Sequence, residues 1–350
     1  MEPYRRGAAP RHEARVNVAG LLSSVRAQQP AVETLRRSVA AGRVHHAYLF
    51  DGPDGVGKEL AAWGLAQTLV CERRTAGQSE ACGACSSCTR AIPRPPETTS
   101  RHPDVVVIER GLYDPTTIGR KSPEVQEISI DQVRTLVLAR AAFAPREGRA
   151  KVFIVRRADE LGLSAANALL KTLEEPGANT HFVLMTSAPD ALLPTIRSRT
   201  QRVRFGSLPE DVVASLLIQL GVDASKAAQI APFAAGSMTQ AVLLSDPQVS
   251  EERNEFVSSA FAALSARNLG AALDFAEAAK KLAKPALVAQ LDALASTIAT
   301  EGRDSARAGD DRADSAWARY ALALSAIRDI EGNASPQLAM EAMLIRMRGV

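Results

Sequence analysis

Aromatic residues, net charge and long apolar runs are all scarce in this chain. Only 4% of its 350 residues are aromatic, and 42 Lys and Arg against 39 Asp and Glu leave a formal net charge of +3. So small a charge gives no argument of its own for nucleic-acid binding, and the few aromatics argue against a stacking surface for bases. Because no apolar run approaches the roughly 18 residues of a membrane span, we expect no membrane contact and a cytoplasmic location.

The N-terminal segment does not have the pattern of a signal peptide. The first 16 residues carry four arginines together with Glu2 and Glu13, and no apolar stretch follows them. We therefore interpret residues 1–20 as a flexible tail. The remaining length, with 46% hydrophobic residues overall, is enough for two or three domains with cores of their own.

Cysteine is also scarce, and its four copies are clustered. They lie within 18 residues in the spacing C-x10-C-x2-C-x2-C, at Cys71, Cys82, Cys85 and Cys88. The small residues between them allow four thiolates to close on one tetrahedral Zn²⁺, whereas disulfides at this close spacing would be strained and are rare in the cytosol. We predict a structural zinc site with no open coordination position, in an insertion at about residues 71–90.

A glycine-rich loop predicts a phosphate-binding site. The run Gly-Pro-Asp-Gly-Val-Gly-Lys follows an apolar segment and opens onto a helical pattern, which makes Gly52, Gly55, Gly57 and Lys58 the candidate nucleotide-binding residues. Glu59 follows the lysine where the pattern requires Ser or Thr, so the hydroxyl that would hold Mg²⁺ is missing.

A second part of the nucleotide chemistry is also altered. The apolar run 152–155 is the expected source of a metal-ordering acid, but it leads into Arg156 and Arg157, which would repel Mg²⁺. Asp159 and Glu160 follow too late and would point elsewhere unless the chain bulges. We therefore expect weak or absent nucleotide binding and no hydrolysis.

The spacing of apolar runs predicts an α/β domain followed by helices. Helical patterns such as 129–142 and 164–175 separate the apolar runs, which indicates a parallel sheet covered on both faces. Apart from one strand, the Pro- and Thr-rich segment 89–128 is expected to form loops. The five predicted strands are 47–51, 105–108, 152–155, 182–185 and 202–205.

After Phe205 the pattern becomes helical. Residues 208–247 are expected to form a small helical lid, with helices at 209–220, 224–234 and 237–245 and a hinge at Asp246-Pro247. Residues 248–350 read as an Ala- and Leu-rich helical domain, with a polar break at 301–314 and a final helix from about 336.

Several motifs, in this order, resemble one family. They are His45 to Phe50 before the loop, the four-cysteine cluster, Ala168 to Pro176, Ile196 to Arg199, and Asn333 to Glu341. Together they are similar to the bacterial clamp-loader ATPases, the tau/gamma and delta prime subunits of DNA polymerase III. The resemblance implies an AAA+ P-loop domain over 21–207, a helical lid over 208–247 and a helical collar over 248–350.

Departures from the family pattern indicate a passive subunit. Motor subunits carry Thr after the loop lysine, an acidic pair after the second strand and an arginine in the lid, where this chain has Thr239. Arg199 of the family's Ser-Arg-Cys motif is retained, with Thr200 replacing Cys. The resemblance to delta prime implies a stator without ATPase activity of its own, which supplies Arg199 as an arginine finger in trans.

The same resemblance implies the partners. They are tau/gamma and delta subunits in a heteropentamer of the DNA polymerase III holoenzyme, a sliding clamp, and primed DNA contacted through the assembly. Two alternatives stay open at this stage. One is an autonomous tau/gamma-like ATPase that uses Glu59 for Mg²⁺ and Asp159 or Glu160 as the second acid. The other is a zinc-containing DNA-binding module with a decayed phosphate loop.

Overall fold

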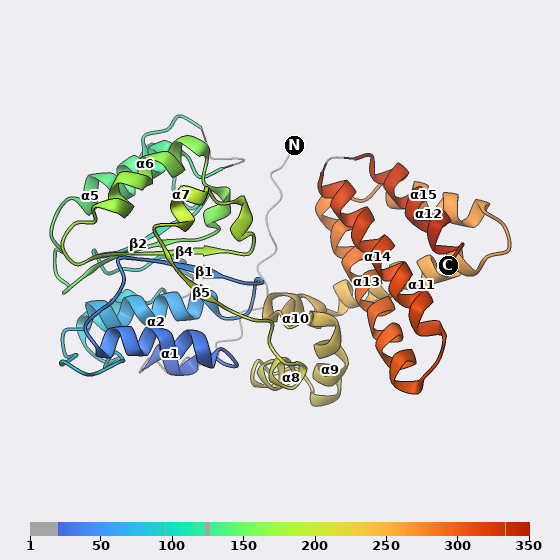
Figure 1. Cartoon of the computed structure of the whole chain (residues 1–350), viewed down its shortest axis with the longest axis horizontal. Coiled ribbons are helices and arrows are strands. Elements are labelled where there is room, and N and C mark those ends of the chain that lie inside the picture. The colour runs from blue at the N-terminus through green and yellow to red at the C-terminus, as the bar shows by residue number, and fades with distance from the viewer. Residues whose placement is uncertain (1–19, 95, 123–126, 333) are drawn as a thin grey trace. The chain divides into compact units, whose positions relative to one another are not determined.

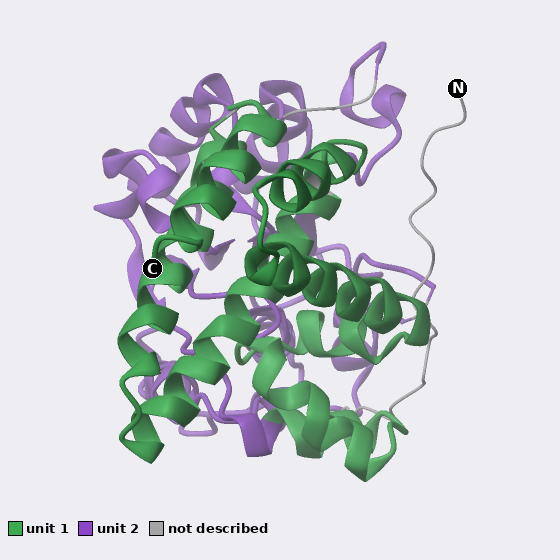
Figure 2. Ribbon diagram, turned by 90° about the vertical axis from the view of Figure 1, so that its right-hand side faces the viewer, with its two compact units in different colours: residues 1–11, 213–350 green, residues 12–212 purple. Residues whose placement is uncertain are grey.

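The chain forms two compact units. The computed structural model describes residues 20–94, 96–122, 127–332 and 334–350, and its units divide between Val212 and Val213 (Figure 2). The predicted tail 1–20 lies almost wholly outside the described residues. The predicted boundaries at 207/208 and 247/248 stay predictions.

The unit that ends at Val212, purple in Figure 2, comes first in the chain, and we call it the first unit and the other the second unit. The first unit is built on a five-stranded parallel sheet, as predicted. Its strand order is β2-β3-β4-β1-β5, and every residue of β1, β2 and β3 is buried because helices cover both faces. Figure 1 shows α1 and α2 on one face and α5, α6 and α7 on the other. The strands are β1 Ala47–Asp51, β2 Val105–Ile108, β3 Lys151–Val155, β4 Thr180–Thr186 and β5 Gln201–Arg204.

The helices predicted for this unit are present, one of them with a local change. The helix expected over 129–142 is present, but its centre, Val133–Leu138, is π-helical. Apart from β2, the described part of the segment 89–128 is mainly loop, and it also contains the end of α3 and the short 3-10 helix Pro115–Ile118. The α-helices are α1 Gln29–Ala40, α2 Lys58–Val70, α3 Ser86–Ala91, α4 Ile130–Gln132, α5 Ala139–Ala141, α6 Leu163–Glu174 and α7 Pro194–Arg197.

The described part of the second unit is helical. Its core is rich in alanine, including Ala260, Ala276 and Ala323, and small side chains allow neighbouring helices to approach closely. No helix within the described ranges is long and apolar enough to cross a membrane. The helices are α8 Glu210–Gln219, α9 Ala224–Ile230, α10 Met238–Ser245, α11 Pro247–Ser265, α12 Gly270–Ala279, α13 Lys284–Ala308, α14 Arg312–Glu331 and α15 Pro336–Met347.

One detail of this unit differs from the sequence prediction. The polar break expected at 301–314 is much shorter, because α13 continues to Ala308 with its charged residues on exposed positions, and Gly309 ends it in a left-handed conformation at φ 68°. At Asp246-Pro247, where the sequence predicts a hinge, α10 has ended at Ser245 and α11 begins. The Asp246 carboxylate accepts a hydrogen bond from the N–H of Gln248 at 3.0 Å, and Pro247 occupies the first position of α11.

Candidate functional site

The phosphate loop lies between β1 and α2, at the carboxyl edge of the sheet. Gly52 and Gly57 have φ of 146° and 103°, a region that favours glycine. A side chain at Gly52 would also place its Cβ 2.1 Å from the carbonyl oxygen of Phe205. The backbone conformation of the loop therefore requires glycine at these positions.

The loop lysine is turned back onto the loop itself. Lys58 is only 7% exposed, and its Nζ donates to the carbonyl oxygens of Gly52 and, at 2.7 Å, Pro53. Burial lowers the pKa of Lys58, while the nearby carboxylates of Asp54 and Asp159 oppose the shift. Its hydrogen-bonding capacity is thus met within the loop.

Glu59 and Arg156 form an ion pair beside the loop. The Arg156 guanidinium binds the Glu59 carboxylate, and it also donates to Glu109 at 2.8 Å and to the carbonyl oxygen of Thr98 at 3.1 Å. It lies 5.8 Å from the ring centre of Trp63, whose Nε1–H donates to Glu59 at 3.1 Å. The two residues that depart from the motor pattern therefore compensate each other's charge.

The acids after β3 are placed differently from the sequence prediction. Arg157 adopts a left-handed conformation at φ 47°, which turns the chain back into the short helix Ala158–Glu160. Asp159 thereby lies near Lys58, and it accepts a hydrogen bond from the Thr186 hydroxyl at the end of β4. The chain thus makes the turn that the prediction gave as its exception. Glu160 pairs instead with Arg110, at 2.7 Å.

The four cysteines come together as one cluster between α2 and α3. Their Sγ atoms all lie within 4.8 Å of one another, and those of Cys82 and Cys88 are 3.9 Å apart. Four thiolates around a tetrahedral Zn²⁺ at about 2.3 Å would be about 3.8 Å apart, so the residues fit such an ion. The four cysteines therefore form a cluster that could hold a metal ion, and the zinc itself stays a prediction.

Backbone groups around the cluster favour ionised sulfur. The N–H groups of Cys82 and Cys88 point at the Sγ atoms of Cys71 and Cys85, each at 3.4 Å. Although burial opposes it, hydrogen bonds from the N–H groups of Ala84 and Cys85 lower the pKa of Cys82 to about 6. Burial raises the pKa of Cys88. Thiolates, the metal-binding form, are thus favoured at part of the cluster.

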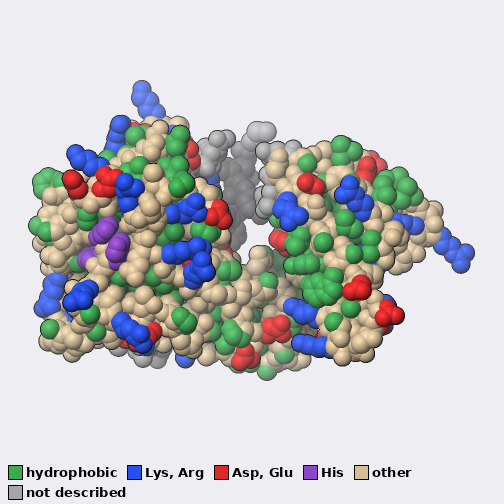
Figure 3. All heavy atoms as spheres, in the orientation of Figure 1, with side chains coloured by type: hydrophobic (Ala, Val, Ile, Leu, Met, Phe, Trp, Pro, Cys, Tyr) green, Lys and Arg blue, Asp and Glu red, His purple; other side chains and the backbone are tan. Residues whose placement is uncertain are grey.

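Arg199 follows α7 and is held by an acid from α6. Its Nε donates to the Glu174 carboxylate at 2.8 Å, and its terminal nitrogen donates to the carbonyl oxygen of Thr195 at 3.0 Å. The Arg199 side chain remains one-third exposed, at the edge of an open hollow of about 540 Å³ that His45 and His46 also line. These two rings are stacked 4.3 Å apart, and Figure 3 shows histidine side chains gathered in one place on this unit.

The hollow joins three motifs that are distant in the sequence. His45 and His46 precede β1, Glu174 ends the run Lys-Thr-Leu-Glu, and Arg199 belongs to the Ser-Arg motif. Sequence reasoning attached no chemistry to Glu174. Its position in the motif Ala168 to Pro176 was the one sequence signal for a role, and the structure shows Glu174 as the partner of Arg199. Thr239 is exposed in α10, with no charge to offer a phosphate.

Comparisons with known proteins point to one family. A family model described as DNA polymerase III, delta subunit, matches residues 27–209. The DNA polymerase III subunit gamma/tau of Mycobacterium tuberculosis is 35% identical over 193 residues, which cover 55% of this chain and 30% of that protein. The subunit delta' of Bacillus subtilis is 33% identical over 218 residues, which cover 62% of this chain and 59% of that protein.

The matched part of the chain spans less than two thirds of either relative. A solved structure, a gamma subunit-related protein of DNA polymerase III from Thermotoga maritima, is 21% identical. Its alignment covers 91% of this chain and 98% of that chain, with a TM-score of 0.40.

Proposed function

This chain belongs to the family described as DNA polymerase III, delta subunit, and we propose that it is the delta prime subunit of a bacterial clamp loader. In this role it is a stator that supports ATP-driven loading of the sliding clamp on primed DNA. The observation that carries the proposal is the Glu59–Arg156 ion pair, which replaces the metal-binding residues of a motor, combined with a retained Arg199.

The phosphate loop has no catalytic role in this proposal. Hydrolysis needs a hydroxyl and an acid that order Mg²⁺ between the β- and γ-phosphates. Here Glu59 and Arg156 neutralise each other, and Lys58 is bound by the loop carbonyls. In this proposal the loop keeps its structural role but takes no part in ATP hydrolysis. Its residues are Gly52, Gly55, Gly57 and Lys58.

Arg199 acts in trans in this proposal, on ATP bound to a neighbouring motor subunit. A guanidinium supplied across a subunit boundary stabilises charge that develops on the γ-phosphate. Arg199 is partly exposed and paired with a single carboxylate, so it can exchange Glu174 for a phosphate when a neighbour docks. The hollow beside it gives a phosphate space to approach.

The proposed assembly is a heteropentamer with tau/gamma and delta subunits. In it, residues 21–207 are the AAA+ module, 208–247 the lid and 248–350 the collar that holds the subunits together. The metal of the cysteine cluster is Zn²⁺, since a closed set of four thiolates suits this ion. It would tie the segment after α2 to α3 and leave no coordination position for catalysis.

The test is ATP hydrolysis by the reconstituted assembly with clamp and primed DNA. We expect Arg199→Ala to leave assembly intact and to lower stimulated turnover by the share of one motor site, because the finger of that site alone is lost. Arg197→Ala is the matched control, since Arg197 lies in the same motif and pairs with Asp190. Equal rates for wild type and Arg199→Ala, or an equal fall in both variants, would refute the finger.

A tau/gamma-like motor remains the second candidate because Asp159 does reach the loop. Its carboxylate lies near enough to Lys58 to oppose the lowering of its pKa by burial, a position from which an acid could order water on Mg²⁺. An ATPase assay of the isolated chain distinguishes the two candidate functions. Magnesium-dependent hydrolysis that disappears in Lys58→Ala would establish the motor, whereas hydrolysis only in the mixture supports the stator.

A further inference from the structure

The second unit holds a buried arginine, Arg253, that no acid among the described residues neutralises. Arg253 of α11 is 9% exposed, and its guanidinium lies 4.2 Å from the ring centre of Phe233. Among the described residues this cation–π contact is its only recorded interaction, without a hydrogen bond or an ion pair. A buried cation without a counter-charge is costly, and burial accordingly lowers the pKa of Arg253.

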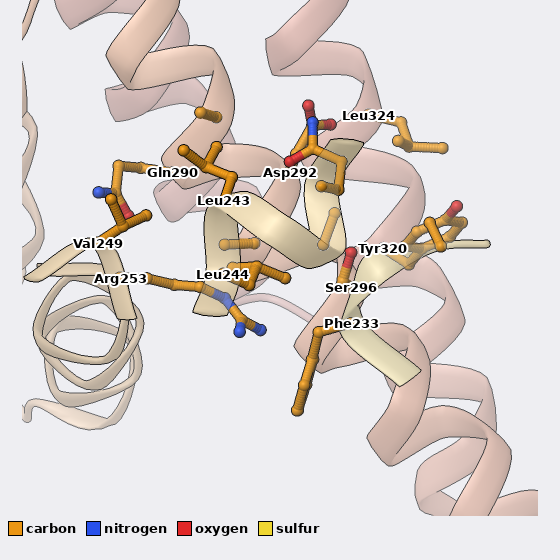
Figure 4. A pocket seen from close by; sticks show the side chains of 15 residues that line it. Phe233, Leu243, Leu244, Val249, Arg253, Gln290, Asp292, Ser296, Tyr320 and Leu324 are labelled. Carbon is orange, nitrogen blue, oxygen red and sulfur yellow. The ribbon is translucent and has the colours of Figure 1, made fainter. Parts of the chain in front are cut away.

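This arginine lines a pocket of about 310 Å³ between α10, α11, α13 and α14 (Figure 4). The volume lies at the lower end of the range found for small-molecule sites. The walls are largely apolar, with Leu243 and Leu244 from α10, Val249 from α11 and Leu324 from α14. Such walls suit the hydrocarbon body of a ligand.

A second polar group in the pocket lacks a partner. The Oε1 atom of Gln290 is buried and accepts no hydrogen bond from the described residues. The hydroxyl groups of Ser296 and Tyr320 line the same pocket. Buried amide oxygens are almost always hydrogen-bonded, so this atom calls for a donor from a bound molecule or water.

We propose that this pocket binds a small organic monocarboxylate with an apolar or aromatic body and one hydroxyl group. Its carboxylate pairs with Arg253, whose planar fork of N–H donors matches a carboxylate in a two-point contact. Its hydroxyl group meets the amide oxygen of Gln290. Arg253 is the one cation among the described residues that line the pocket, which matches a ligand with a single carboxylate.

The site is separate from the proposed clamp-loader chemistry. All residues that line it belong to the second unit, whereas the phosphate loop, the cysteine cluster and Arg199 belong to the first. The proposal therefore does not depend on ATP turnover or on Arg199.

The first experiment maps binding on the wild-type full chain. 4-Hydroxybenzoate is titrated to about 20 mM at constant ionic strength, and methyl groups are followed by NMR. We expect saturable shifts at Leu243, Leu244, Val249 and Leu324. The neutral 4-hydroxybenzamide should bind about tenfold more weakly, because it lacks the charge. An absence of saturable shifts, equal binding of the amide, or shifts outside the pocket would overturn the proposal.

The second experiment removes the charge. Arg253→Met keeps an apolar side chain of similar length against Phe233, and we expect it to weaken 4-hydroxybenzoate binding by about tenfold or more. Arg267→Met, at an exposed arginine of the same unit, should bind like wild type. Unchanged affinity in Arg253→Met would contradict the site. If that variant does not fold, the wild-type map and the amide comparison decide the question.

Discussion

The ion pair beside the phosphate loop makes a measurable prediction about stability. Replacing Arg156 by Met leaves the Glu59 and Glu109 carboxylates without their shared cation. Removing one partner of a buried ion pair costs about 3–5 kcal/mol. The side chain of Arg156 is 12% exposed, but those of Glu59 and Glu109 are 50% and 30% exposed. Because solvent screens both acids, we expect a smaller loss, about 2 kcal/mol.

A double-mutant cycle isolates the pair itself. Glu59→Gln alone should cost about 1 kcal/mol, since Arg156 keeps its hydrogen bond to Glu109 at 2.8 Å. Combining it with Arg156→Met should cost less than the sum of the two single changes, with a coupling free energy of about 1 kcal/mol. This coupling should fall at high salt, because the pair is partly exposed.

The assay is denaturant unfolding followed by fluorescence. The chain has two tryptophans, and Trp63 contacts both members of the pair, so a Trp317→Phe background makes the signal local to the loop. Arg157→Met is the matched control, because Arg157 is half-exposed and its loss should cost less than about 0.5 kcal/mol. Equal losses for the two arginine variants, or zero coupling, would refute the reasoning.

Two further predictions concern the metal cluster and a buried acid. Cys85→Ser should abolish zinc binding and lower the melting temperature, as elemental analysis and calorimetry would show, and it should leave the ATPase rate of the assembly unchanged. Wild-type protein that contains no metal would refute the zinc prediction. Asp104→Asn should cost about 2 kcal/mol near neutral pH, because the carboxylate accepts three backbone N–H groups at 2.6, 2.8 and 2.7 Å. Although burial opposes them, these bonds lower the pKa of Asp104. The stabilisation is therefore present above about pH 4 and lost as the pH falls through the lower folded-state pKa. A stability difference between wild type and Asp104→Asn that grows as the pH falls would contradict this.

Local patterns were enough to predict the sheet, the loop and the cysteine cluster. Five short apolar runs bounded by turn residues became five parallel strands, since a strand buried on both faces needs continuous apolar sequence. The glycines of the loop and the spacing of the cysteines carry their chemistry within a few residues. Helix ends were harder to predict. The charged residues before Gly309 suggested a loop but lie on a solvated helix.

Charge pairing was decided by tertiary structure. In the sequence, Glu59 and Arg156 are two separate departures from the residues expected for nucleotide chemistry. The fold brings these residues, 97 positions apart, together as one ion pair. Glu174 meets Arg199 in the same way, and the left-handed turn at Arg157 returns Asp159 to the loop. The sequence by itself determined which groups are present and where the chain is extended or helical, because backbone propensity and burial act over neighbouring residues. Which charges face each other depends on the order of the strands, and only the folded chain brings distant side chains within hydrogen-bonding distance.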